Sequence, residues 1–207
     1  MLPPIFASSR RSVAAALAAS LTVAGCASAR LPAPEVRESA RSTTIYTARL
    51  SVHFAGPRGR ARATVLAAFA RPDSLRIEVP GPGGARVVVV AAAGRLTAVF
   101  PGERTVFEGR STMEDVEAVL GVALTPEEIM DLLVGVPGPR IADARVTWGK
   151  RYPRHVSGRL ADGTSLVVKA QAIQTPETLS ASAFAAPPHP GYRAIDADEA
   201  REMWARR

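Results

Sequence analysis

The sequence predicts a mainly β fold that also contains helices: one curved antiparallel sheet of about ten strands forming an unclosed barrel, with two helices inserted as a lid or plug. Three observations support this. Apolar and polar side chains alternate from residue 46, short turns rich in glycine and proline separate the alternating segments, and residues 113–120 and 125–133 have helical spacing instead. Strands joined by such short turns run antiparallel, because a parallel crossover needs a dozen or more residues.

The alternating segments define the expected strands. In the first, Tyr46, Leu50 and Phe54 share one face while Arg49 and His53 share the other, which is typical of a half-buried strand. Turn residues such as GPRG and PGPGG bound the later segments. We expect further strands at 61–69, 75–79, 85–93, 95–100, 104–109, 144–148, 155–160, 165–170 and 178–184.

Two segments interrupt the alternation with helical spacing. Val116 and Leu120 fall on one face of the first. In the second, Thr125 and Glu128 form a capping box around Pro126 at the first helical position. A short helix over 196–206 is expected to end the chain.

The first 26 residues have the layout of an exported chain. Arg10 and Arg11 precede a mostly apolar run, 12–25, as in a secretory signal peptide. The run is too short to span a bilayer comfortably. It ends in VAGC at 23–26, which resembles the lipobox of bacterial lipoproteins.

That resemblance implies that the Cys26 sulfur carries a diacylglycerol, that the chain is cut before it, and that the new amino terminus is acylated. Ala27, which is not an aspartate, resembles the signal that sends Gram-negative lipoproteins to the outer membrane. A buried, inert or unpaired thiol is the alternative for Cys26. We expect four parts: a signal peptide at 1–25, the lipidated cysteine and a flexible tether at 26–44, a half-barrel domain at 45–185, and a proline-rich tail with a short helix at 186–207.

Charge and cysteine content narrow the function classes. The net charge of +7 becomes +5 when Arg10 and Arg11 are removed with the leader, which favours anionic headgroups or acidic partners. A basic but merely solvated surface explains the charge as well. Nucleic acid is not expected, since the arginines are scattered and few aromatic residues lie between them. Cys26 is the only cysteine, so no internal disulfide forms.

Catalytic patterns are absent from the sequence. His53, His155 and His189 lack the spacing of metal ligands. No serine lies in a nucleophile elbow, and PGPGG lacks the lysine and helix of a phosphate loop. We therefore expect no enzyme, no metal and no cofactor.

The expected inner face is rich in alanine and valine, and such small side chains need not fill the space inside a wide curved sheet. A cavity is therefore predicted, with the alternative that the helices plug the interior and these residues are plain core. The expected walls are Leu50, Val52, Val65, Phe69, Leu75, Ile77, Val88, Val90, Leu96 and Phe100, with the face uncertain by one residue in the valine run; the expected lid residues are Ile129, Leu132 and Leu133.

The order of these features resembles the outer-membrane lipoprotein receptor LolB and, more broadly, periplasmic lipid-binding domains of the LolA and LolB type. The likeness covers 45 to about 185 and includes RIEVPGPGG at 76–84 and LLVGVPG at 132–138. It implies an unclosed barrel with a lidded apolar hollow, which receives acylated lipoproteins or lipids from a soluble periplasmic carrier of LolA type and places lipoproteins in the outer membrane.

Two departures from the LolB pattern bear on the delivery step. The family's loop reads Pro-Leu-Gly, with an exposed leucine for membrane insertion, whereas Pro82 is followed here by Gly83 and Gly84. Leu132 stands where LolB usually has a tryptophan. The expected function is still that of a lipid-anchored, monomeric protein on the periplasmic face of the outer membrane that holds acyl chains. The alternative is a structural or assembly lipoprotein that uses the same fold to dock proteins.

Overall fold

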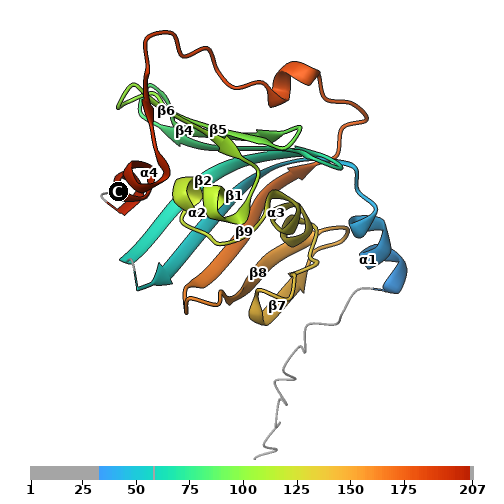
Figure 1. Cartoon of the computed structure of the whole chain (residues 1–207). Coiled ribbons are helices and arrows are strands. Elements are labelled where there is room, and N and C mark those ends of the chain that lie inside the picture. The colour runs from blue at the N-terminus through green and yellow to red at the C-terminus, as the bar shows by residue number, and fades with distance from the viewer. Residues whose placement is uncertain (1–32, 58, 206–207) are drawn as a thin grey trace, which may run out of the picture. The chain divides into compact units, whose positions relative to one another are not determined.

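A single ten-stranded sheet organises the part of the chain that the computed structural model describes, residues 33–57 and 59–205 (Figure 1). The sheet order is β10-β6-β5-β4-β3-β2-β1-β9-β8-β7. Its end strands β10 and β7 do not pair with each other, so the predicted unclosed barrel is confirmed. The strands are β1 (Ile45–Gly56), β2 (Gly59–Ala70), β3 (Ser74–Gly81), β4 (Gly84–Ala92), β5 (Arg95–Phe100), β6 (Thr105–Arg110), β7 (Ala142–Trp148), β8 (Pro153–Arg159), β9 (Ser165–Gln174) and β10 (Arg193–Ile195).

Helices α2 (Met113–Leu120) and α3 (Pro126–Leu133) are the two helices that the sequence predicts, and they cover the concave face of the sheet (Figure 1). The capping box of α3 is present: the Thr125 hydroxyl accepts from the Glu128 backbone N–H at 3.2 Å, and the Glu128 carboxylate accepts from the Thr125 N–H at 2.9 Å. Both bonds satisfy donors that a helix start leaves free. The second helix therefore begins where the sequence predicts.

A helix, α1 (Pro34–Arg41), occupies part of the stretch expected to be a flexible tether. Its sequence explains it locally, because Pro34 stands in the first turn, Glu35 is near the positive end of the helix and Arg41 near the negative end. Ala40, only 1% exposed, joins the core.

The tenth strand is not where the sequence places it. Residues 178–184 form no strand; they pass into a short 3-10 helix, η1 (Ala181–Phe184). This segment contacts β3 and β4, and the Arg76 guanidinium donates to the Ala185 carbonyl at 3.1 Å. It thus crosses the outer face of the sheet and leaves the edge to β10, which pairs with β6 in parallel. One edge of the sheet is therefore parallel, where the sequence predicts an antiparallel sheet throughout.

The predicted carboxy-terminal helix is present as α4 (Ala197–Ala205). It packs against α2, burying Ala200 and Met203. The Thr105 hydroxyl donates to the Met203 sulfur at 3.8 Å. The end of the chain is thereby joined to the helices on the concave face.

Aromatic side chains pack together at the end of the barrel where β1 begins and β2 ends. The rings of Tyr46 and Phe69 stack with centroids 5.0 Å apart, and Tyr152 approaches Tyr46 edge-on at 5.9 Å. Burial, and secondarily the neighbouring Tyr152, raise the pKa of Tyr46 well above its ordinary value. Tyr46 is therefore neutral at all physiological pH values and acts as core.

Candidate apolar pocket

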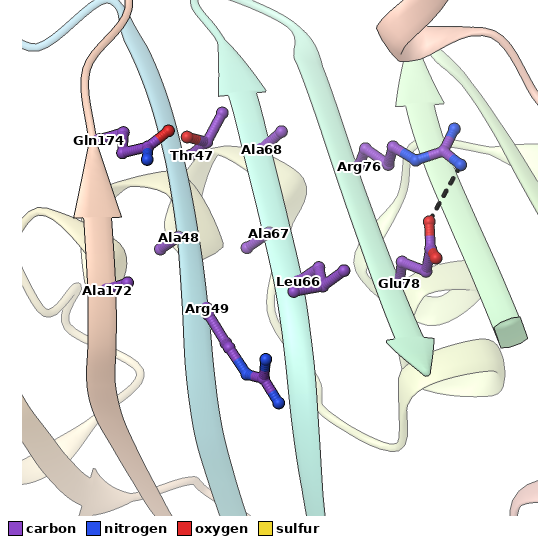
Figure 2. Close-up of a pocket in the computed structure, with 10 residues that line it drawn as sticks. All are labelled: Thr47, Ala48, Arg49, Leu66, Ala67, Ala68, Arg76, Glu78, Ala172 and Gln174. Carbon is purple, nitrogen blue, oxygen red and sulfur yellow. Dashed lines mark hydrogen bonds and ion pairs between the residues drawn. The ribbon is translucent and has the colours of Figure 1, made fainter. Parts of the chain in front are cut away.

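One candidate site is a groove on the outer face of the sheet, over β9, β1, β2 and β3 (Figure 2). It has a volume of about 380 Å³. Two of its charged side chains, Arg76 and Glu78, pair with each other at 3.2 Å. The third, Arg49, is exposed, and alanines such as Ala68 and Ala172 form much of the rest. Leu66, 39% exposed, is its one large apolar side chain. One ion pair, a single exposed arginine and small side chains give this groove few groups with which to hold a ligand.

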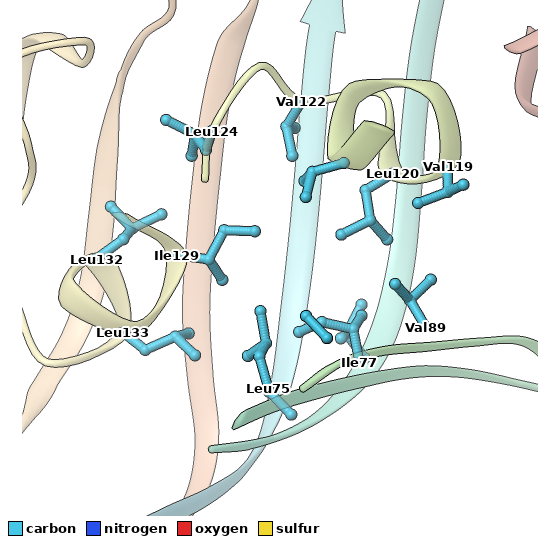
Figure 3. Packing of buried hydrophobic residues seen from close by; sticks show 14 of the residues in the cluster. Leu75, Ile77, Val89, Val119, Leu120, Val122, Leu124, Ile129, Leu132 and Leu133 are labelled. Atoms are coloured by element: carbon cyan, nitrogen blue, oxygen red, sulfur yellow. The ribbon is translucent and has the colours of Figure 1, made fainter. Parts of the chain in front are cut away.

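The second candidate is a pocket between the concave face and the helices, with a volume of about 80 Å³. Every side chain that lines it is apolar. Figure 3 shows the helix side chains Leu132 and Leu133 opposite Leu75 and Ile77 of β3. The lining comprises Leu50, Val52, Phe54, Ala63, Val65, Ile77, Val79, Leu120, Val122, Leu124, Ile129, Leu132, Leu133, Leu166 and Val168.

Exposure along the strands shows where this pocket opens. On β1, Leu50 is 2% exposed, whereas Val52 and Phe54 further along are half-buried. On β2 the same change occurs from Val65, 7% exposed, to the half-buried Ala63. The side chains are therefore sealed towards the start of β1 and accessible towards the β1–β2 turn. We call this accessible end the mouth.

The helices reach the pocket through a narrow apolar stripe. Ile129, Leu132 and Leu133 of α3 are each at most 8% exposed. Leu120 ends α2, and Gly121 then turns the chain with a φ of 72°, a conformation that glycine adopts without strain. The loop that follows adds Val122 and Leu124 to the lining.

Polar contacts hold α3 from outside the pocket. The Arg71 guanidinium, in the β2–β3 turn, donates to the Asp131 carboxylate at 2.6 Å. Arg140 donates to Glu128 at 2.9 Å. The side chains of Arg71 and Asp131 are 22% and 36% exposed, so water screens this pair and limits its strength.

The predicted site residues divide into three groups. Those that line the pocket are Leu50, Val52, Val65, Ile77, Ile129, Leu132 and Leu133. Those that lie in the core without lining the pocket are Phe69, Leu75, Leu96 and Phe100. The third group, Val88 and Val90, is buried but outside the main core, which contains Val87 and Val89 instead.

Sequence reasoning missed several lining residues. Phe54, Ala63 and Val79 continue the same alternation as Leu50, Val65 and Ile77, so extending each strand by one step would have found them. Leu120, Val122, Leu124, Leu166 and Val168 also line the pocket. Leu166 and Val168 come from β9, whose place beside β1 is a long-range pairing that no local pattern encodes.

The remaining predicted positions lie elsewhere. Pro82, Gly83 and Gly84 form the exposed β3–β4 turn, where Gly83 and Gly84 have positive φ angles of 83° and 141°. Cys26 lies outside the described residues. Within the described part of the chain, no three histidine, cysteine, aspartate or glutamate side chains gather as metal ligands would. Across the same residues, no helix combines the length and hydrophobicity needed to cross a membrane.

Comparison with solved structures gives only distant likenesses. An uncharacterized conserved protein from Thermus thermophilus is 10% identical, with a TM-score of 0.46, and the match covers 78% of this chain and 97% of that one. A LolA superfamily protein from Nitrosomonas europaea is 10% identical, with a TM-score of 0.45, covering 76% and 99%. A DUF1329 family protein from Desulfovibrio piger is 10% identical, with a TM-score of 0.40, covering 75% and 98%.

One of these neighbours belongs to the superfamily that the sequence resembles. At such low identities and TM-scores, what they do says nothing about what this chain does. No family model and no curated protein matches the chain.

Proposed function

We propose that the protein binds acyl chains of lipids or lipoproteins in the pocket beneath α2 and α3, and that it carries out no covalent chemistry. The observation that carries this proposal is a wholly apolar lining that remains accessible at the mouth. Apolar surface normally leaves water on folding, so an apolar hollow open at one end is suited to a ligand that is itself apolar.

The size of the pocket sets a condition on binding. Its volume of about 80 Å³ is well below the roughly 300–1,000 Å³ of ordinary ligand sites. A long acyl chain can therefore enter only if α2 and α3 move away from the sheet. The contacts that hold these helices over the pocket are largely apolar, and acyl methylenes entering the hollow replace the lost contacts at about 0.8 kcal/mol each.

The proposed cellular role follows from the sequence features at the amino terminus. Acylation of Cys26 anchors the protein to the periplasmic face of the outer membrane, where it receives lipoproteins from a soluble carrier of LolA type. Direction is set by small differences in apolar burial between carrier, receptor and bilayer, because each methylene contributes a similar amount in each.

Capture of a fluorescent acyl probe tests the pocket. Leu132→Asp and Ile77→Asp place a charge in the apolar lining and are expected to weaken capture strongly, since an unpaired buried carboxylate is costly. Arg76→Ala, on the outer face beside Ile77, is the control and should leave capture nearly unchanged. Equal losses in all three variants would contradict the pocket. Circular dichroism identifies variants that have unfolded.

Membrane fractionation tests the anchor. Cys26→Ala removes the only thiol and is expected to give a soluble or unprocessed protein. Unchanged membrane association of a processed Cys26→Ala chain would refute acylation at this residue. Native mass spectrometry of the wild-type protein is expected to detect a co-purifying lipid, whereas a protein-docking module would carry none.

A further inference from the structure

A further hollow lies at the end of the sheet opposite the mouth, and charged and amide side chains line it together with apolar ones. Residues 149–154, which connect β7 to β8 and which we call the basic loop, form one wall. Residues 170–175 at the end of β9 form the other, and the hollow has a volume of about 570 Å³. It is open to solvent, and its lining combines charged side chains with apolar ones such as Tyr152 and Ile173, so it suits a ligand that carries a charged group.

The charges that line this hollow have one sign. Lys150, Arg151 and Arg154 are exposed, and none of them makes an ion pair with another described residue. Gln171 and Gln174 add neutral amides, and no carboxylate lines the hollow. By contrast, arginines such as Arg71, Arg76 and Arg140 are each paired with an acid. Unpaired cations gathered around a hollow that no carboxylate lines match an anionic ligand such as a phosphate group.

The basic loop is held in shape and fastened to the start of the domain. The Gly149 N–H donates to the Tyr152 carbonyl at 2.8 Å, closing the turn. The Tyr152 hydroxyl lies 3.1 Å from the Thr43 hydroxyl, in hydrogen-bond contact, and Thr43 is the second residue after α1. The three cations are therefore presented beside α1 by a fixed turn.

Chain length then limits how far this end can lie from the lipid anchor. Pro34, the first residue of α1, is separated from Cys26 by a segment that spans at most about 28 Å when fully extended. The mouth lies further away, because Phe54 is roughly 30 Å along β1 from Ile45 at the α1 end. If one end of the domain meets the bilayer, the short segment between Cys26 and Pro34 favours the end with the basic loop.

We propose that Lys150, Arg151 and Arg154 form a binding site for the anionic headgroups of the bilayer in which the protein is anchored. This inference rests on the proposed acylation of Cys26. It makes the contact two-part, with acyl chains in the membrane and phosphates in the basic hollow, a combination that gives firm attachment. The mouth then points away from the anchoring bilayer, towards whatever delivers an acyl chain.

Vesicle co-sedimentation tests the headgroup site without the anchor. The chain from Ala27 to Arg207 contains every described residue and the whole core, and it lacks the thiol. It is mixed with vesicles of phosphatidylcholine alone, or of phosphatidylcholine with phosphatidylglycerol. The test variant is Lys150→Gln/Arg151→Gln/Arg154→Gln. The matched control, Arg49→Gln/Arg62→Gln/Lys169→Gln, removes the same charge from exposed positions on the outer face of β1, β2 and β9.

The expected result is binding to the phosphatidylglycerol vesicles alone, reduced by high salt because the contact is exposed. Each cation near an anionic surface raises the partition coefficient onto the vesicles about fivefold, so the loop variant, which lacks three cations, should partition on the order of a hundredfold less. The control should lose much less. Equal loss in both variants, equal binding to both vesicles, or binding of an acidic protein but of no vesicle would overturn the inference.

The acyl probe separates this inference from the pocket. The loop variant should capture the probe as the wild-type chain does, because the basic loop is far from the mouth. Leu132→Asp should show the converse: it should lose probe capture and keep headgroup binding. A wild-type chain that binds phosphatidylglycerol vesicles but no acyl probe would refute the proposed function and leave the headgroup site standing.

Discussion

Filling the pocket with a side chain should block an acyl ligand without harming the fold, and Ala63→Leu is the change that does this. Ala63 is half-buried at the mouth and opposes Val52 across the strand pair. The larger side chain adds three carbons to a hollow of about 80 Å³. If these carbons displace three ligand methylenes at about 0.8 kcal/mol each, affinity falls by about 2.4 kcal/mol, or roughly fiftyfold.

The matched control is Ala68→Leu, the same chemical change on the other face of the same strand. Acyl probe affinity is measured by fluorescence titration and stability by thermal unfolding. Ala63→Leu should unfold at the same temperature as the wild-type protein or higher, since it fills empty apolar space. Probe affinity equal to that of Ala68→Leu would refute the pocket as the acyl site. A large drop in unfolding temperature would show instead that the space is already filled.

Three further changes test the parts that surround the pocket. Arg71→Ala removes the ion pair to Asp131 and should cost under about 1 kcal/mol of stability, since both partners are partly exposed. Stopped-flow capture of the probe should become about two- to fivefold faster, because α3 is held less firmly. The control Arg159→Ala, which breaks a 3.9 Å surface pair, should change neither stability nor capture rate. Gly135→Ala should lower the free energy of unfolding by about 2 kcal/mol, because Gly135 has a φ of 82° and an added Cβ would lie 2.8 Å from the Trp148 ring; a loss below the error of denaturant unfolding would contradict this packing. Thr125→Ala removes the helix cap and should cost about 1 kcal/mol, whereas Thr125→Ser should restore most of it in the same unfolding assay.

The sequence predicts the local structure better than the long-range pairing. Alternation located β1, β2 and β3 because one face of each is buried and the other carries polar groups such as Arg49 and Arg76. The apolar run at 85–93 also predicted β4, but it did not assign the two faces, because Val87, Val88, Val89 and Val90 are all buried. The 3-10 helix η1 contacts β4 on the outer face, so both faces are buried and the period disappears.

In the tail, alternation predicted a strand that the structure does not contain. Residues 178–184 alternate as a strand does, yet they pair with no strand of the sheet, and η1 lies across its outer face instead. The three-residue β10 was invisible because its pairing with β6 depends on where the chain returns. For the candidate site, the pocket side chains on β1, β2, β3 and α3 could be predicted from period alone, whereas those on β9 could not.

The pairing of β1 with β9 has a consequence for how the chain reaches its final shape. It joins residue pairs as distant as Thr47 and Gln174 in the middle of the sheet. Closing so long a loop costs entropy before any contact repays it, which slows folding. The amino-terminal hairpins therefore keep the β1 edge unpaired until nearly the entire polypeptide has been synthesised. A truncated product ending before residue 165 should aggregate rather than mature.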